Sequence, residues 1–323
     1  MVKQGVGVNY GIGLSNRPIA YNKVVEILRS TGANSVKLFQ HDPAFLNAMA
    51  GQDISVVQGT SVEDINRFAS DFQAAKNFVA NGIVPFLNST KITSIAVGNE
   101  ANEGMYGGRF ISTLVPAMRN VHRALVDFGL ERRIKVTTPL SFAIVTDTYP
   151  PSAGRFADAW RATMRDMLRF LTDTGSCLTV NIYPFFTRQG NPRDVTLDYA
   201  LGSRNEVAVR DGPFNYTNLM DAMVDSVIAA MTKEGFPDLF LEIGETGWPT
   251  ADDPTGNATI SNAQTYNNAL VSRVLRGQGT PRRPGWMQMY IFALLDEDRK
   301  PAGVERHWGI YRMEGEPKYT VKF

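Results

Sequence analysis

Residues 239–249 read LFLEIGETGWP, a mainly apolar run that leads into a carboxylate between two glycines. Residues 92–100 read ITSIAVGNE and end in the same way. Both patterns indicate a buried strand with a glutamate, Glu245 or Glu100, at its C-terminal end. In a barrel of parallel strands these ends form one face, where active sites lie. We therefore expect the two carboxylates to meet there.

Six further apolar runs rich in β-branched residues accompany these two, and helical patterns separate them. The predicted strands are 5–11, 35–40, 54–60, 92–100, 135–141, 177–185, 239–247 and 287–296. The predicted helices are 21–31, 63–81, 109–129, 158–174, 217–235 and 261–276. Strands that alternate with helices favour a parallel sheet, and eight strands close a (β/α)8 TIM barrel. No linker divides the pattern, so we predict an α/β fold with one catalytic barrel domain over residues 1–323.

The connection between the sixth and seventh strands is the widest. It contains RQGNPR at 188–193 and RDGP at 210–213, both rich in turn residues. We predict an elaborated loop region there.

Composition limits the possible partners. The chain has 323 residues, 33 Lys+Arg and 32 Asp+Glu, so no basic excess suggests nucleic acid. No apolar run reaches the length of a membrane span. The single cysteine, Cys177, excludes a disulfide within the chain. Nothing indicates an obligate protein partner, so we expect a monomer.

The usual cofactor and metal motifs are missing from the sequence. The run GVGVNY at 5–10 lacks the third glycine of a dinucleotide fingerprint, and no Walker or G-x-S-x-G motif occurs. His41, His122 and His307 lack metal-ligand spacing. We expect neither a metal nor a cofactor.

The paired carboxylates suit the cleavage of a glycosidic bond, with one as acid and the other as nucleophile. Glu100 ends a run that carries no other charge, and partial burial raises the pKa of such a carboxyl toward that of a general acid. A capping or loop acid is the alternative. Asn99 is a candidate to hydrogen-bond a sugar hydroxyl. Glu242 is a rival to Glu245, but strand alternation predicts that it faces the other way, into a structural ion pair behind the strand.

Two charged segments follow the eighth strand, DEDRK at 296–300 and ERHWG at 305–309. A solvated surface is the ordinary interpretation. Their position at the rim of the site makes Glu297, Lys300 and Glu305 candidates to bind hydroxyls and to tune the nucleophile, and Lys300 could keep Glu245 ionised.

Aromatic residues near the strand ends are candidates to stack against sugar rings. The alternative for each is a place in the core. The candidates are Tyr10, Tyr183, Phe186, Trp248 and Trp308.

Over essentially its whole length the chain resembles the plant β-1,3-glucanases of glycoside hydrolase family 17. The segments that carry the resemblance are GVNYG at 7–11, VKLF at 36–39, AVGNE at 96–100, VNIYP at 180–184, GETGWP at 244–249 and ERHWGI at 305–310.

The resemblance implies a (β/α)8 barrel and retaining, double-displacement hydrolysis of internal linkages in linear β-1,3-glucans such as callose or laminarin. It implies Glu100 as the acid, Glu245 as the nucleophile and Glu297, Lys300 and Glu305 as supporting residues. Two alternatives stay open: a β-1,3-glucan transglycosylase on the same fold, and a β-glucan-binding protein without turnover.

The resemblance also implies an extracellular or cell-wall location. The N-terminus lacks the apolar region of a secretory signal, so either the protein is cytoplasmic or a signal has been removed. The sequence offers three N-glycosylation triplets, which begin at Asn88, Asn215 and Asn257. On the resemblance and these triplets together, we expect a secreted glycoprotein.

Overall fold

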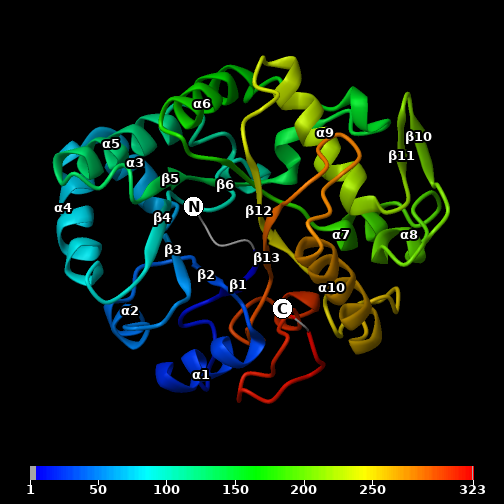
Figure 1. Ribbon diagram of the computed structural model, residues 1–323, viewed down its shortest axis with the longest axis horizontal. Coiled ribbons are helices and arrows are strands. Elements are labelled where there is room, and N and C mark those ends of the chain that lie inside the picture. The colour runs from blue at the N-terminus through cyan, green and yellow to red at the C-terminus, as the bar shows by residue number, and fades with distance from the viewer. Residues whose placement is uncertain (1–4, 322) are drawn as a thin grey trace.

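The structure, a computed structural model, describes residues 5–321 and 323. Its main sheet runs through the centre of the molecule with helices around it (Figure 1). The strands of this sheet are β1 Val6–Tyr10, β2 Ser35–Leu38, β3 Ser55–Gly59, β4 Ile92–Ala96, β5 Lys135–Thr137, β6 Pro139–Ser141, β9 Leu178–Asn181, β12 Leu241–Thr246 and β13 Gln288–Ile291.

The sheet is a barrel of parallel strands. Neighbours in it follow the order β5-β4-β3-β2-β1-β13-β12-β9-β6. Only Thr138 separates β5 from β6 in the chain, so the two are halves of one interrupted strand, one paired with β4 and the other with β9. The predicted eight-stranded (β/α)8 fold is confirmed, with 135–141 as the strand that closes it.

Helices surround the barrel, and among those described none combines the length and hydrophobicity needed to cross a membrane. The α-helices are α1 Tyr21–Thr31, α2 Pro43–Ala48, α3 Glu63–Ser70, α4 Phe72–Gly82, α5 Leu114–Asp127, α6 Arg161–Asp173, α7 Pro184–Gly190, α8 Leu197–Leu201, α9 Leu219–Lys233 and α10 Ile260–Leu275. The predicted helix 63–81 is divided at Asp71. The backbone of Asp71 is extended, and its carboxylate caps α4 by accepting the Gln73 amide at 2.8 Å.

Side chains alternate between the two faces of the barrel strands. On β2, Val36 and Leu38 are fully buried in the apolar core. Between them Lys37 points into the barrel, where it reaches Glu245 on β12. Polar groups in the lumen and apolar groups under the helices thus come from the same short strands.

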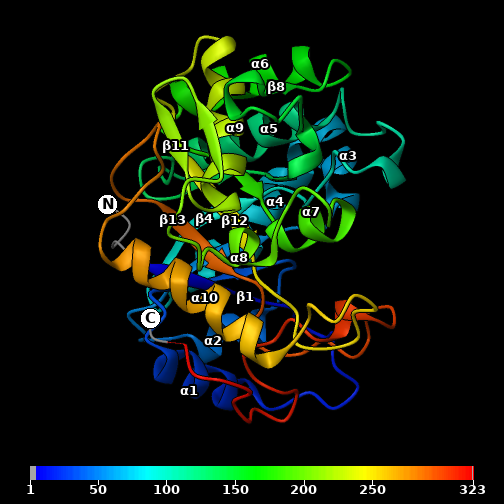
Figure 2. The same cartoon turned by 90° about the vertical axis from the view of Figure 1, so that its right-hand side faces the viewer.

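Short elements enlarge one side of the barrel, at the right of Figure 1 and toward the viewer in Figure 2. The predicted elaboration between the sixth and seventh strands is confirmed. Along the chain, β9 and α9 are separated by α7, α8 and the antiparallel pair β10 Val209–Asp211 and β11 Phe214–Tyr216. A second pair, β7 Val145–Thr146 and β8 Arg155–Phe156, was not predicted because two-residue strands leave no periodic pattern.

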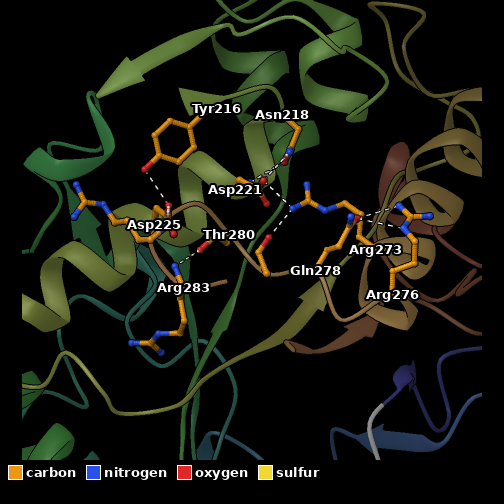
Figure 3. A network of polar contacts seen from close by, with 11 residues as sticks. Tyr216, Asn218, Asp221, Asp225, Arg273, Arg276, Gln278, Thr280 and Arg283 are labelled. Carbon is orange, nitrogen blue, oxygen red and sulfur yellow. Dashed lines mark hydrogen bonds and ion pairs between the residues drawn. The ribbon is translucent and has the colours of Figure 1, made fainter. Parts of the chain in front are cut away.

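A polar network fastens α9 to this side of the barrel (Figure 3). Asp221 of α9 accepts a hydrogen bond from Arg273 of α10 at 2.8 Å. One turn later, Asp225 accepts from the Tyr216 hydroxyl of β11 at 2.9 Å. Buried acids with such partners hold a helix in one position. The network therefore fixes the position of α9, whose Met223 lines the cleft described below.

Candidate active site

A cleft lies at the C-terminal ends of the barrel strands. Its volume is about 600 Å³. It is lined by Leu14, Phe39, Asn99, Glu100, Glu103, Ser141, Phe142, Ala143, Asn181, Tyr183, Phe186, Thr187, Met223, Glu245, Phe292, Lys300, Glu305 and Trp308. The two predicted carboxylates thus share one cleft. Within residues 5–321 and 323, no three His, Cys, Asp or Glu side chains gather as a metal site would require.

Glu100 lies in the turn after β4. The chain turns through left-handed conformations at Gly98, with φ of 67°, and at Glu100 itself, with φ of 51°. Such a φ is uncommon for a residue with a side chain and persists where the surroundings enforce it. Here the Glu100 amide donates to the Pro139 carbonyl at 2.8 Å, and Asn181 Nδ2 donates to the carboxyl Oε1 at 2.9 Å.

Burial, and next the nearby charge of Glu245, raises the pKa of Glu100 to about 7. The hydrogen bond from Asn181 acts in the opposite direction. Glu100 therefore keeps its proton to near-neutral pH, as a general acid requires.

Glu245 is held at both carboxylate oxygens. Lys37 Nζ lies 2.9 Å from Oε1, and the Tyr183 hydroxyl donates to Oε2 at 2.8 Å. Burial raises the pKa of Tyr183 well above its ordinary value, so this hydroxyl stays a donor. Glu245 is only 4% exposed, and Lys37 supplies the opposite charge that a buried carboxylate needs.

Asn181 joins the two carboxylates. Its Cα pairs with that of Glu245 across β9 and β12, while its side chain donates to Glu100. Glu100 and Glu245 are thus neighbours around one strand end, although 145 positions separate them in the sequence.

Sequence reasoning did not identify Lys37 as a site residue. Besides Glu245, its ammonium contacts Asn9 Oδ1 at 3.3 Å and Asn99 Oδ1 at 3.5 Å, and it lies over the Phe39 ring. A single lysine inside the apolar run VKLF was the available signal. Its role depends on β2 facing β12 across the lumen, which the sequence does not reveal.

Of the three supporting residues predicted after the eighth strand, two line the cleft. Lys300 and Glu305 face the cleft. Glu297 is 4% exposed and forms an ion pair with Lys300 at 2.8 Å, while burial raises its pKa. The ammonium predicted to neutralise Glu245 is therefore paired with Glu297, and Lys37 occupies the position beside Glu245.

Glu242 does not face away from the site, so that prediction is wrong. The pairing of β12 shifts register between Ile243 and Glu245, as at a β-bulge, and a bulge interrupts the alternation of side chains. Glu242 accepts a hydrogen bond from Thr179 of β9 at 3.2 Å. A Cβ on Gly244 would meet the Thr179 methyl at 2.6 Å, so this stretch of β12 packs closely against the same side chain.

Glu242 is a second carboxyl in the barrel interior. Burial raises its pKa to about 7, and the charge of Lys37 acts against that shift. The register shift turns Glu242 into the same lumen as Glu245, and not into the predicted ion pair behind the strand.

Three of the five predicted aromatic residues line the cleft, namely Tyr183, Phe186 and Trp308. Phe186 is 40% exposed and offers an open ring. Trp308 is almost fully buried and packs against Phe186, with 5.5 Å between the ring centroids. Phe292, which was not predicted, joins them and lies under Lys300.

Tyr10 and Trp248 are core residues, which corrects their prediction as sugar contacts. Trp248 is fully buried, packs against Phe185 and donates its indole N–H to the Asn257 carbonyl at 2.9 Å. Tyr10 packs against Phe45, and burial raises its pKa to about 12. Both lie beside strand ends, where sequence position alone does not show whether a ring lines the cleft or packs in the core.

The chain is similar to known proteins over almost its whole length. The model of the glycosyl hydrolases family 17 matches residues 6–323. A glucan endo-1,3-beta-glucosidase of Vitis vinifera is 36% identical over 99% of this chain and 92% of its own length. The glucan endo-1,3-beta-glucosidase GI of Hordeum vulgare is 38% identical over 98% of this chain and 99% of its own.

The fold has a close match among solved structures. CJP38, a beta-1,3-glucanase and allergen of Cryptomeria japonica pollen, superposes with a TM-score of 0.94 at 40% identity, over 99% of both chains. The fold and the sequence match over almost the whole chain agree, and the chain belongs to glycosyl hydrolase family 17.

Proposed function

We propose that this protein is a retaining endo-β-1,3-glucanase that hydrolyses internal linkages of linear β-1,3-glucans. Its family and the names of its relatives support the substrate class. One observation carries the mechanism: a protonated carboxyl, Glu100, shares a cleft with a carboxylate, Glu245, that is paired with a buried lysine.

In the first step, Glu245 attacks the anomeric carbon of the sugar on the non-reducing side of the scissile bond. The bond to the glycosidic oxygen breaks as Glu100 gives that oxygen its proton. A glycosyl ester forms on Glu245, and the remainder of the glucan leaves with a new free hydroxyl. Lys37 and Tyr183 hold the attacking carboxylate in place through their contacts with its two oxygens.

In the second step, the ionised Glu100 takes a proton from water, and the resulting hydroxide attacks the anomeric carbon. Glu245 leaves as a carboxylate and is again paired with the ammonium of Lys37. Two inversions give net retention. Retaining pairs stand about 5–5.5 Å apart, and the contact through Asn181 supports such a close arrangement.

Binding of the glucan rests on the remaining cleft residues. The exposed ring of Phe186 suits the apolar face of a glucosyl unit. Asn99, Lys300 and Glu305 offer amide, ammonium and carboxylate groups to the hydroxyls.

The test is digestion of laminarin with product analysis. We expect oligosaccharides of several lengths early in the reaction, with the β-anomer appearing first by proton NMR. Glu245→Gln should abolish turnover, whereas Glu206→Gln, at an exposed carboxylate, should retain it. First appearance of the α-anomer would overturn retention. Products longer than the starting oligosaccharide would identify a transglycosylase, and binding without new reducing ends would identify a glucan-binding protein.

We also propose an extracellular or cell-wall location. Asn88 and Asn215, which begin two of the glycosylation triplets, are exposed. Expression through a secretory pathway should therefore give a protein whose mass falls on treatment with an N-glycosidase. An unchanged mass would count against the predicted glycoprotein.

A further inference from the structure

Two hollows adjoin along α10, and among the described residues neither shares a lining residue with the catalytic cleft. The larger, of about 860 Å³, lies between the turn after α8, the start of α9, α10 and the loop 276–285 that leads to β13. The smaller, of about 490 Å³, continues along α10. Asn268, Ser272 and Arg276 line both hollows, so the two form one continuous depression, which we call the α10 groove.

The α10 groove has the length and the lining of a site for a polar chain. Gln264, Asn268, Ser272 and Arg276 line it at intervals of four residues, so they lie on one face of the helix. With a rise of 1.5 Å per residue, this row spans about 18 Å. Its members offer amide, hydroxyl and guanidinium groups. Such a row suits an extended ligand that carries many hydrogen-bonding groups.

Most charges at the groove are already balanced within the protein. Arg204 lies 3.6 Å from Asp198 and 3.3 Å from Glu206. Arg273 forms an ion pair with Asp221 at 2.8 Å. The groove therefore offers many hydrogen-bonding groups and little net charge. A neutral ligand rich in hydroxyls fits this balance better than a polyanion does.

Two guanidinium groups keep donors available for such a ligand (Figure 3). Arg276 has no carboxylate partner in the part of the chain that the structure describes, and its Nε and Nη2 contact Gln278 Oε1 at 3.3 and 3.1 Å. Arg273 donates to Asp221 and to the Gly279 carbonyl through Nη2 alone, which leaves Nε and Nη1 without a hydrogen bond among the described residues. A planar guanidinium held in this way presents donors in a fixed direction.

Asp221 supplies an acceptor on the same wall. Its Oδ2 accepts from Arg273 and Asn218 at 2.8 Å each, whereas its Oδ1 is buried and has no partner within residues 5–321 and 323. A buried acceptor without a donor costs free energy. A sugar hydroxyl could supply that donor, and a fully ionised anion could not. Asp221 and the balanced charges thus favour the same class of ligand.

We propose that the α10 groove is a second, non-catalytic binding site for a chain of β-1,3-glucan. Glucan hydroxyls accept hydrogen bonds from Arg273 and Arg276 and donate to Asp221. The identity of the polymer rests on the proposed function, and the inference adds an anchoring site remote from the bond that is cleaved. A glucan held at two places keeps its other linkages near the catalytic cleft, because the second contact becomes intramolecular.

Binding to the inactive Glu245→Gln variant tests the groove directly. Isothermal titration calorimetry with a linear β-1,3-gluco-oligosaccharide should give two sites per protein. Adding Asn205→Ala and Arg276→Ala, at exposed residues on facing walls, should weaken one site about tenfold, the scale of lost hydrogen bonds to a charged group. The melting temperature should not fall. Arg132→Ala, at a side chain that is 96% exposed outside the groove, is the matched control and should leave both sites intact.

One site per protein, or a second site that survives both substitutions, would overturn this inference. Binding of polygalacturonate in place of β-1,3-glucan at the groove would overturn the choice of a neutral polymer.

Turnover by the otherwise native protein gives a second readout. Asn205→Ala with Arg276→Ala should lower the rate on insoluble β-1,3-glucan relative to the rate on a short soluble oligosaccharide, and Arg132→Ala should not. An unchanged ratio would overturn the anchoring role. Absence of hydrolysis of every β-1,3-glucan by the native protein would instead refute the proposed function, while loss of the second binding site in the calorimetric test would still support the groove.

Discussion

Lys37 places its ammonium 2.9 Å from the carboxylate of Glu245, and both side chains are buried at the centre of the barrel. The lysine comes from β2 and the glutamate from β12, on strands separated in the sheet by β1 and β13. A buried pair of this kind makes each charge depend on the other. The geometry therefore assigns to Lys37 the orientation and charge balance of the nucleophile.

Replacing Lys37 by methionine keeps the length of the side chain and removes its charge. We expect turnover of laminarin to fall at least about 100-fold, because the attacking carboxylate loses a preorganised charged contact in the active site. The same substitution breaks a buried pair and should lower the free energy of unfolding by about 3–5 kcal/mol. Lys91→Met, at an exposed pair with Asp53, should retain native turnover. Circular dichroism would verify folding, and a folded Lys37→Met protein with native kcat would refute the role of this lysine.

Activity should fall as pH rises through about 7. The pKa of Glu100 is raised to about 7, so the acid is protonated below that value and loses its proton above it. Asn181 donates to Glu100 and so favours the ionised form. Asn181→Ala should therefore move the basic limb of the kcat/KM profile to higher pH, and a shift to lower pH would contradict this electrostatic account.

Glu242 should make stability depend on pH. Its pKa is raised from 4.5 to about 7, so between these values the folded protein binds more protons than the unfolded chain. Stability from this group is therefore lost as pH rises from about 4.5 through 7. Thermal melts across this range should show a shallower decline for Glu242→Gln than for the native protein; parallel curves would show that Glu242 has an ordinary pKa.

Trp248 and Phe186 should respond to truncation in different ways. Trp248→Ala removes a fully buried indole, which costs about 3–5 kcal/mol of stability in comparable cores. Phe186→Ala removes a ring that is 40% exposed in the cleft, so the melting temperature should change little while KM for laminarin rises. Denaturant unfolding and steady-state kinetics of both variants provide the comparison. The reverse pattern would restore Trp248 as a sugar contact.

The strand pattern and both catalytic candidates could be predicted from the sequence because each depends on local information. Apolar runs locate the strands, and parallel strands bring their C-terminal ends to one face wherever they lie in the chain. The division of one predicted strand into β5 and β6 around Thr138 did not disturb this logic.

The predictions that were wrong or missing concern side chains whose positions depend on contacts between distant segments. The orientation of Glu242 was mispredicted because a shift in strand register at Gly244 is invisible in the alternation of LFLEIGE. Lys37 was overlooked because its partner lies across the lumen. Trp248 and Tyr10 were misplaced because a ring beside a strand end packs inward or outward according to its neighbours, here Phe185 and Phe45.

In the proposed mechanism, Glu245 forms the covalent bond to the sugar. Incubation with a 2-deoxy-2-fluoro laminari-oligosaccharide carrying a good leaving group should trap that intermediate, and peptide mass spectrometry should locate it. We expect a single glycosyl adduct on Glu245. An adduct on Glu242 or Glu297 would contradict it, as would turnover of the same compound to an inverted product without any adduct.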